Sequence, residues 1–274
     1  MRTALYRSTN YKWIVFATVA LGSITNVTHH GGVSIALPTI AQNLSVSLTT
    51  VQWIILAESL AISAMLLPMG RLSDQVGRKP IHLIGLFLFG TMAFFSGLSP
   101  WLSNSIGSLD PIVCMIFFRI LQGIGAAMTQ ATGMAMVTSV FANNERGKGL
   151  GAHGSVIGTG GIIGPILGGL LVTYVGWEWV FWINVPLSSI ALVGAIIFLD
   201  PSRFSKKDEK NSSFDWVGAG LSTSIIMVFL FTLSNGSSVG WLSLPILVGA
   251  LVFIVSVVGF IWWESKSKEP MLDL

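Results

Sequence analysis

The chain has 274 residues, of which 52% are hydrophobic and only 10% are charged, and its mean hydropathy is +0.75. A typical soluble domain carries about 25% charged residues, so this chain has too few polar side chains to cover a water-exposed surface. The composition therefore excludes a soluble enzyme, a nucleic-acid-binding domain and a disordered regulator.

Long stretches without Asp, Glu, Lys or Arg predict membrane-spanning helices. A helix needs about 20 apolar residues to cross the hydrocarbon core, and there the backbone must satisfy its own hydrogen bonds. We therefore expect an all-α polytopic membrane protein with eight spans. In chain order the spans occupy about residues 13–37, 51–69, 80–99, 111–140, 150–174, 179–199, 217–234 and 244–263.

The spans and the basic residues together predict a domain organisation. Residues 1–199 would form a six-helix bundle, followed by a cytoplasmic linker (200–216), two further transmembrane helices (217–263) and a cytoplasmic tail (264–274). Fourteen of the fifteen Lys and Arg residues lie before the first span, after the last one, or between spans 2 and 3, 4 and 5, or 6 and 7. Because basic residues accumulate in cytoplasmic loops, we expect a multi-pass protein of the cytoplasmic (inner) membrane with both termini in the cytoplasm.

Ionisable side chains inside the predicted spans are the first candidates for function, since each costs about 2.5–3.5 kcal/mol to insert. Glu58, Arg119 and His29 lie in spans 2, 4 and 1, each in the half away from the basic loops. We expect Glu58 and Arg119 either to pair, directly or through water or substrate, or to stay apart, each satisfied by backbone and hydroxyl groups or with Glu58 protonated. Gln122 and Gln130 follow Arg119 on one helical face, where they would line a cavity or bond neighbouring helices.

Glycines dominate the fifth span. Gly160, Gly164 and Gly168 recur every four residues and form a flat ridge that lets another helix approach closely. Pro165 and Gly169 interrupt the same helix, and a proline removes a backbone donor and permits a kink. The pattern predicts either static close packing or a hinge between alternate states.

The loop predicted between spans 2 and 3 combines glycines with charges. Gly70 would let the end of span 2 approach a neighbouring helix, and Gly77 would supply the turn. Asp74 is suited to a helix N-terminus, and Arg78 follows at i+4, where the two can pair. Lys79 adds positive charge. Ordinary positive-inside charge explains the basic residues of this loop but not the two glycines around a lone Asp.

Together these motifs resemble the major facilitator superfamily, and more narrowly its 14-helix drug:proton antiporter branch. The loop at 70–79 is similar to the signature between helices 2 and 3, with Ser73 and Gln75 as departures. The resemblance implies that this loop is a conformational switch. The residues from Arg119 to Ala126 resemble the helix 4 pattern, whose arginine is tied to proton coupling. The fifth span resembles the antiporter motif of helix 5. The resemblance implies the N-terminal six-helix bundle of that fold, with spans 7 and 8 as an additional pair.

Two departures from the branch concern the proton-titrating group. His29 stands where a helix 1 aspartate is usual, and Ser34 stands where an asparagine is usual. Glu58 stands where a tyrosine is common. A carboxylate is therefore lost from helix 1 while another appears in helix 2 at a similar depth. We hypothesise that the titrating group has moved to Glu58, together with His29.

The resemblance implies a proton-coupled secondary active transporter, an antiporter that exports small amphipathic or drug-like compounds by alternating access. Its partners would be a small-molecule substrate, protons and the lipid bilayer, with the proton gradient as energy source and no cofactor. A transporter of a defined metabolite, such as a sugar or an organic acid, and a non-transporting sensor or assembly subunit remain alternatives. The sequence has no Ser/His/Asp or metal-ligand constellation, so we expect neither an enzyme nor a metal site.

The length of the sequence departs from the family. Its members have two six-helix halves around a central cavity, whereas this sequence ends in a segment that resembles the junction before helix 9. The second transporter half is missing from this chain. We expect the chain to be the N-terminal portion of a longer protein, with a homodimer as the alternative.

Overall fold

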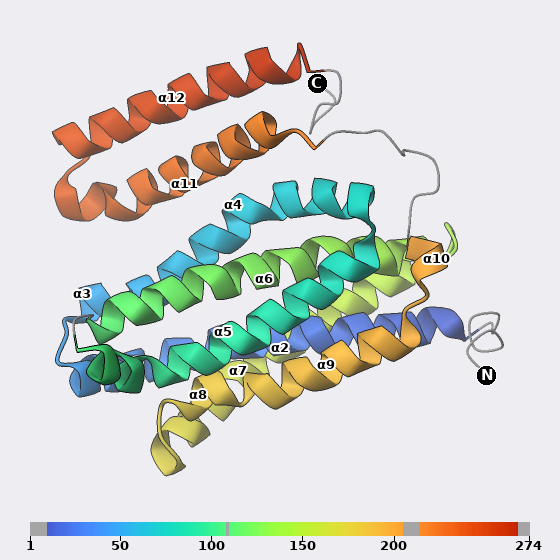
Figure 1. Ribbon diagram of the computed structural model, residues 1–274, viewed down its shortest axis with the longest axis horizontal. Helices are drawn as coiled ribbons and strands as arrows, with labels where there is room; N and C mark the ends of the chain where they lie inside the picture. Colours follow the sequence, from blue (N-terminus) through green and yellow to red (C-terminus); the bar gives the residue numbers. More distant parts are fainter. Residues whose placement is uncertain (1–9, 108–109, 205–213, 268–274) are drawn as a thin grey trace.

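The computed structural model of the chain describes residues 10–107, 110–204 and 214–267, and within these ranges every regular element is a helix (Figure 1). The helices are α2 (Tyr11–Leu44), α3 (Leu48–Val51), α4 (Trp53–Val76), α5 (Arg78–Ile106), α6 (Pro111–Val140), α7 (Arg146–Tyr174), α8 (Trp179–Trp182), α9 (Asn184–Phe198), α10 (Pro201–Phe204), α11 (Trp216–Val239) and α12 (Leu244–Glu264). The expectation of an all-α fold is confirmed.

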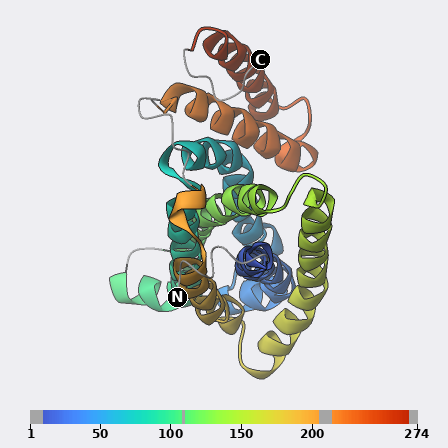
Figure 2. The same cartoon turned by 90° about the vertical axis from the view of Figure 1, so that its right-hand side faces the viewer.

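Helix α2 occupies the middle of the bundle. Seen end-on in Figure 2, it is surrounded by the other long helices of the first 200 residues. It packs against α7 on one side and against α6 and α9 on the others, while α4 packs against α6. Two apolar clusters lie along α2, one around Val15 and Val19 and the other around Val33 and Ile40. The polar middle of α2 is therefore held between two apolar layers.

Two helices continue beyond the predicted spans. The first span was expected to end at about residue 37, and α2 continues through Pro38 to Leu44. The loop expected at 70–79 is mostly helix, because α4 continues to Val76 and only Gly77, with a φ of 111°, separates it from α5. A helix can continue through polar residues beyond the hydrocarbon core, and there the distribution of charges no longer indicates where the helix ends. Gly77 does supply the predicted turn.

Seven helices of the described part are long and apolar enough to cross a membrane. The helix that contains the first predicted span, α2, is not among them. It is long enough, with 34 residues, but its middle carries several polar side chains, namely Thr25, Asn26, Thr28, His29, His30 and Ser34. Crossing by α2 therefore stays a prediction, and it agrees with the position of α2 alongside the other helices in Figure 1.

The start of α2 and the end of α12 lie at the same end of the bundle (Figure 1). The turn between α4 and α5 and the short helix α10 lie at this end too, so the described basic residues other than Arg119 gather here. We call it the basic end. Helix α10 falls in the predicted linker 200–216, of which residues 205–213 lie outside the described residues. The predicted tail lies outside them from residue 268 onward.

Candidate functional site

Helices α4 and α6 approach each other closely at a glycine. A Cβ added to Gly123 would lie 2.6 Å from the carbonyl oxygen of Glu58 and 2.8 Å from Cβ of Ala61. No larger residue fits without moving a helix. This contact holds Glu58 on α4 beside Arg119, which lies one turn before Gly123 on α6.

Arg119 and Glu58 form a buried ion pair, in which Nη2 of Arg119 donates to Oε2 of Glu58. The two side chains are 0% and 2% exposed. The guanidinium also donates from Nε to the carbonyl oxygen of Ile54, at 3.0 Å, and from Nη1 to Oε1 of Gln122, at 2.8 Å. Of the two arrangements left open by the sequence, the structure has the direct pair.

His29 lies on the other side of the guanidinium. Its Nε2 contacts Nη1 of Arg119 and lies 3.0 Å from Nε2 of Gln122. Both groups are hydrogen-bond donors, so this ring nitrogen has to accept, which requires a neutral imidazole with its proton on Nδ1. Nδ1 lies 2.8 Å from Nδ2 of Asn184, another donor, so a proton on Nδ1 requires the Asn184 amide to turn its Oδ1, which has no partner among the described residues, toward the ring. His29 therefore serves as an acceptor for Arg119, and this geometry does not favour the hypothesis that it titrates with Glu58.

His30, the next residue of α2, was not among the site residues predicted from the sequence. Its Nδ1 lies 3.3 Å from Oε2 of Glu58, and its side chain is 42% exposed. The hydroxyl of Ser59 lies 3.5 Å from its other ring nitrogen. His30 thus joins the buried carboxylate to the bundle surface. Helical geometry was the available signal, because two adjacent histidines point about 100° apart and one can face outward.

The polar cluster, which we define as His29, His30, Glu58, Arg119, Gln122 and Asn184, draws on four helices. Asn184, at the start of α9, was not among the site residues predicted from the sequence. Gln130 was proposed and is not part of the cluster: it is exposed, about three turns from Arg119 along α6. Among the described residues no group of three or more His, Cys, Asp or Glu could hold a metal ion.

The glycine ridge of α7 packs against α2, as the spacing predicted. A Cβ at Gly164 would lie 2.6 Å from the carbonyl oxygen of Thr28, and a Cβ at Gly168 would lie 2.5 Å from Cα of Gly32. Gly160 meets the side chain of Val27. Backbone contact continues past the cluster, since Thr28 directly precedes His29. Any movement of α7 would therefore shift the backbone of α2 beside His29 and His30.

The remaining ridge residues and the predicted switch segment show mixed outcomes. Pro165 lies inside α7, where its ring faces Gly31 of α2, whereas Gly169 would reach only Ile35, at 4.0 Å. A Cβ at Gly70 would meet Ala131 at 3.9 Å, an ordinary contact. The approach of α4 to α6 there does not require a glycine, contrary to our expectation.

Asp74 and Arg78 form the predicted i+4 pair. Nη2 and Nε of Arg78 donate to Oδ1 of Asp74 at 3.0 and 3.2 Å, and Nη1 donates to the carbonyl oxygen of Ala135 on α6, at 3.1 Å. Lys79 donates to the carbonyl oxygen of Ile196 on α9, at 3.1 Å. The segment therefore ties α4, α5, α6 and α9 together at the basic end.

A second ion pair at the basic end joins the start of α2 to the residue before α7. Nζ of Lys12, at the start of α2, donates to Oε2 of Glu145, which precedes α7. This hydrogen bond and then the charge of Lys12 hold the pKa of the Glu145 carboxyl below its ordinary value. The pair joins the two helices whose backbones meet at the glycine ridge.

The fold and the cluster define a class: a polytopic helical membrane protein with an ion pair buried among its spans. The family model described as Major Facilitator Superfamily matches residues 19–263. The chain belongs to this superfamily, and drug-resistance proteins among its relatives place it in the drug-transporter branch.

Three relatives illustrate the similarity. The chain is 32% identical over 264 residues to the riboflavin transporter RibZ of Clostridioides difficile, covering 96% of this chain and 54% of the relative. It is 32% identical over 262 residues to the tetracenomycin C resistance and export protein of Streptomyces glaucescens, covering 96% and 46%. It is 31% identical over 245 residues to the multidrug transporter protein MdtP of Bacillus subtilis, covering 88% and 42%. The chain thus spans about half the length of these relatives.

Among solved structures, the chain resembles a bacterial homologue of the human lysosomal transporter Spinster in its inward-facing, unoccupied conformation. The TM-score is 0.56 at 17% identity, over 94% of this chain and 64% of that one. At this identity the likeness shows the fold alone.

Proposed function

We propose that the chain is the N-terminal portion of a proton-coupled antiporter of the cytoplasmic membrane, which exports small amphipathic compounds by alternating access. The basic end would face the cytoplasm, as the positive-inside rule predicts. The observation that carries the proposal is the ion pair of Glu58 and Arg119, which has a half-exposed histidine beside the carboxylate. Drug-resistance and export proteins among the relatives support the substrate class.

The ion pair gives a proton a means to change the structure. A proton that arrives through His30 and binds Glu58 cancels the negative charge and removes the partner of Arg119. A buried charge that loses its partner is strongly destabilised, so the arrangement of α2, α4 and α6 around Arg119 is no longer the most stable one. Protonation thereby biases the balance between inward- and outward-open states, as coupling requires.

The charge of the substrate follows from the same pair. A cationic compound would compete with Arg119 and with protons for Glu58, so that binding of substrate and binding of protons exclude each other. Mutual exclusion at one carboxylate produces exchange of a cation against protons. The substrate would reach Glu58 from the side of His30, where the cluster meets the surface of the bundle.

A second candidate, transport of a defined metabolite, is favoured by one relative, the riboflavin transporter. A neutral or anionic metabolite would use Arg119 and the amide side chains of the cluster. Fold does not determine substrate, and competition between compounds of each charge separates the two candidates. We place the third alternative, a non-transporting sensor or subunit, behind both.

The test is transport by the complete gene product in proteoliposomes. An imposed pH gradient should drive uptake of a fluorescent lipophilic cation, and Glu58→Gln should abolish the dependence on the gradient. Glu264→Gln is the matched control, because Glu264 is as buried (3% exposed) but lies at the end of α12. Gradient-driven transport that survives in Glu58→Gln would overturn the proposal.

A further inference from the structure

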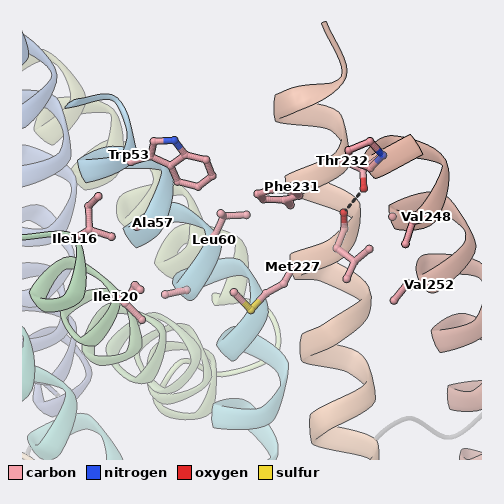
Figure 3. A pocket seen from close by; sticks show the side chains of 14 residues that line it. Trp53, Ala57, Leu60, Ile116, Ile120, Met227, Phe231, Thr232, Val248 and Val252 are labelled. Carbon is pink, nitrogen blue, oxygen red and sulfur yellow. Dashed lines mark hydrogen bonds between the residues drawn. The ribbon is translucent and has the colours of Figure 1, made fainter. Parts of the chain in front are cut away.

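A cavity lies outside the polar cluster, between the six-helix bundle and the pair α11–α12 (Figure 3). Its volume is about 480 Å³, within the range of about 300–1,000 Å³ typical of small-molecule sites. Its walls come from α4 and α6 on one side and from α11 and α12 on the other. Trp53, Leu60, Phe231 and Met227 extend into the gap between α4 and α11 in Figure 3.

The cavity exists because α11 touches α4 near the two ends of the shared stretch. At one end the rings of Trp53 and Phe231 meet with their centroids 6.0 Å apart. Towards the basic end the hydroxyl of Thr223 donates to the carbonyl oxygen of Ala64, at 3.3 Å. Between these contacts the wall of α4 consists of the small side chains Ala57 and Ala61 together with Leu60.

The chemistry of the walls excludes water. Apart from the Thr232 hydroxyl and the Trp53 indole nitrogen, the lining side chains are hydrocarbon or thioether. The hydroxyl already donates to the carbonyl oxygen of Val228, at 2.7 Å. A buried water needs two to four polar partners, which these walls do not offer. An empty space would forfeit dispersion contacts along every wall.

The rim of the cavity opens onto the apolar outer surface. Phe231 and Val248 are each 49% exposed, and Val252 is 42% exposed. Trp53 is the first residue of α4 and Pro245 the second of α12, so the cavity begins at the end away from the basic residues. From Trp53 to Ala61 it runs about 12 Å along the helix axis. In a membrane, the medium that meets this rim is the acyl chain region of one leaflet.

We propose that this cavity is a lipid-binding site, occupied by one acyl chain of a membrane phospholipid that enters from the end away from the basic residues. The chain fills the space between the bundle and the pair α11–α12 and completes their packing. The proposal rests on the membrane location of the protein and not on its transport function.

The test uses the full gene product in vesicles of phospholipid that carries a photoreactive diazirine near the end of one acyl chain. After illumination, mass spectrometry should find adducts on Ala57 or Leu60 of α4. Ala57 is only 5% exposed and lines the cavity, so lipid that stays on the outer surface cannot reach it. Adducts on the exposed face of α12 report surface lipid and provide the internal reference.

Two neighbouring substitutions separate a filled cavity from a general effect. Val248→Trp should fill the cavity and reduce the adducts on α4 at least fivefold, while Leu247→Trp should leave them unchanged. Both residues are 49% exposed on the same turn, but only Val248 lines the cavity. If Val248→Trp does not fold, Val252→Phe fills the cavity from one turn deeper. The proposal is overturned if α4 takes no label while α12 does, or if the filling variants leave the label on α4 unchanged.

Discussion

Replacing Glu58 by Gln should destabilise the bundle, because Arg119 keeps its charge and loses its carboxylate. The two side chains are 0% and 2% exposed, so water cannot take the place of the lost partner. Removing one partner of a buried pair costs about 3–5 kcal/mol. The acceptors at Ile54 and Gln122 remain, and the new amide oxygen can still accept a hydrogen bond. We therefore expect the lower end of this range, about 3 kcal/mol.

The free energy of unfolding can be measured by titration with a denaturing detergent, for Glu58→Gln, Arg119→Gln and the double variant. The double variant replaces the pair by two neutral amides, so it should be more stable than the sum of the single effects by at least about 1.5 kcal/mol. Glu58→Gln combined with Gln130→Ala is the control, because Gln130 is exposed and outside the cluster, and its effect should be additive. Additivity of the two charge substitutions, within about 0.5 kcal/mol, would refute the pairing.

Three further predictions concern packing and the basic end. Gly168→Ala should cost about 1–3 kcal/mol, because its Cβ would lie 2.5 Å from the backbone of α2, whereas Gly161→Ala meets open space and should be neutral or stabilising; equal thermal stability of the two variants would contradict the close contact. Because the folded pKa of Glu145 lies below its ordinary value, its pair with Lys12 contributes stability above the ordinary pKa and loses it as pH falls through the folded pKa. The difference in unfolding midpoint between wild type and Lys12→Met should therefore vanish on acidification, and a difference that persists or grows would show that the pair is not its source. In Arg78→Lys the ammonium group cannot reproduce the simultaneous hydrogen bonds of the guanidinium to the carboxylate of Asp74 and the carbonyl oxygen of Ala135. The variant should therefore lose about 1–2 kcal/mol of stability and show faster hydrogen exchange at the α4–α5 turn. Unchanged exchange would show that the link to α6 is dispensable.

The helices could be predicted from the sequence, because apolar runs of membrane length leave the backbone few alternatives. The ends were less predictable, as the continuation of α2 through Pro38 illustrates. A proline removes one hydrogen bond, and neighbouring helices compensate for it within a bundle, which a local pattern does not reveal. The extension of α4 into the expected loop was also unpredictable, because a helix can continue beyond the apolar run from which it is predicted.

The candidate site was predictable in part. Depth along the spans brought Glu58, Arg119 and His29 into one layer, because depth depends only on residue counts. The rotation of each helix depends on tertiary packing, so the separate roles of His29 and His30 could not be assigned. Asn184 joins the cluster from a helix that begins more than 60 residues after Arg119, a separation that no local pattern bridges.

The most direct test of this account is whether Glu58 takes up a proton under the conditions that drive transport. Infrared difference spectroscopy of the complete gene product in lipid, recorded as pH is lowered, detects the carbonyl stretch of a newly protonated carboxyl group. The account predicts a band that is absent in Glu58→Gln and retained in Glu264→Gln. The same band in Glu58→Gln, or no band across the pH range in which transport follows the gradient, would contradict it.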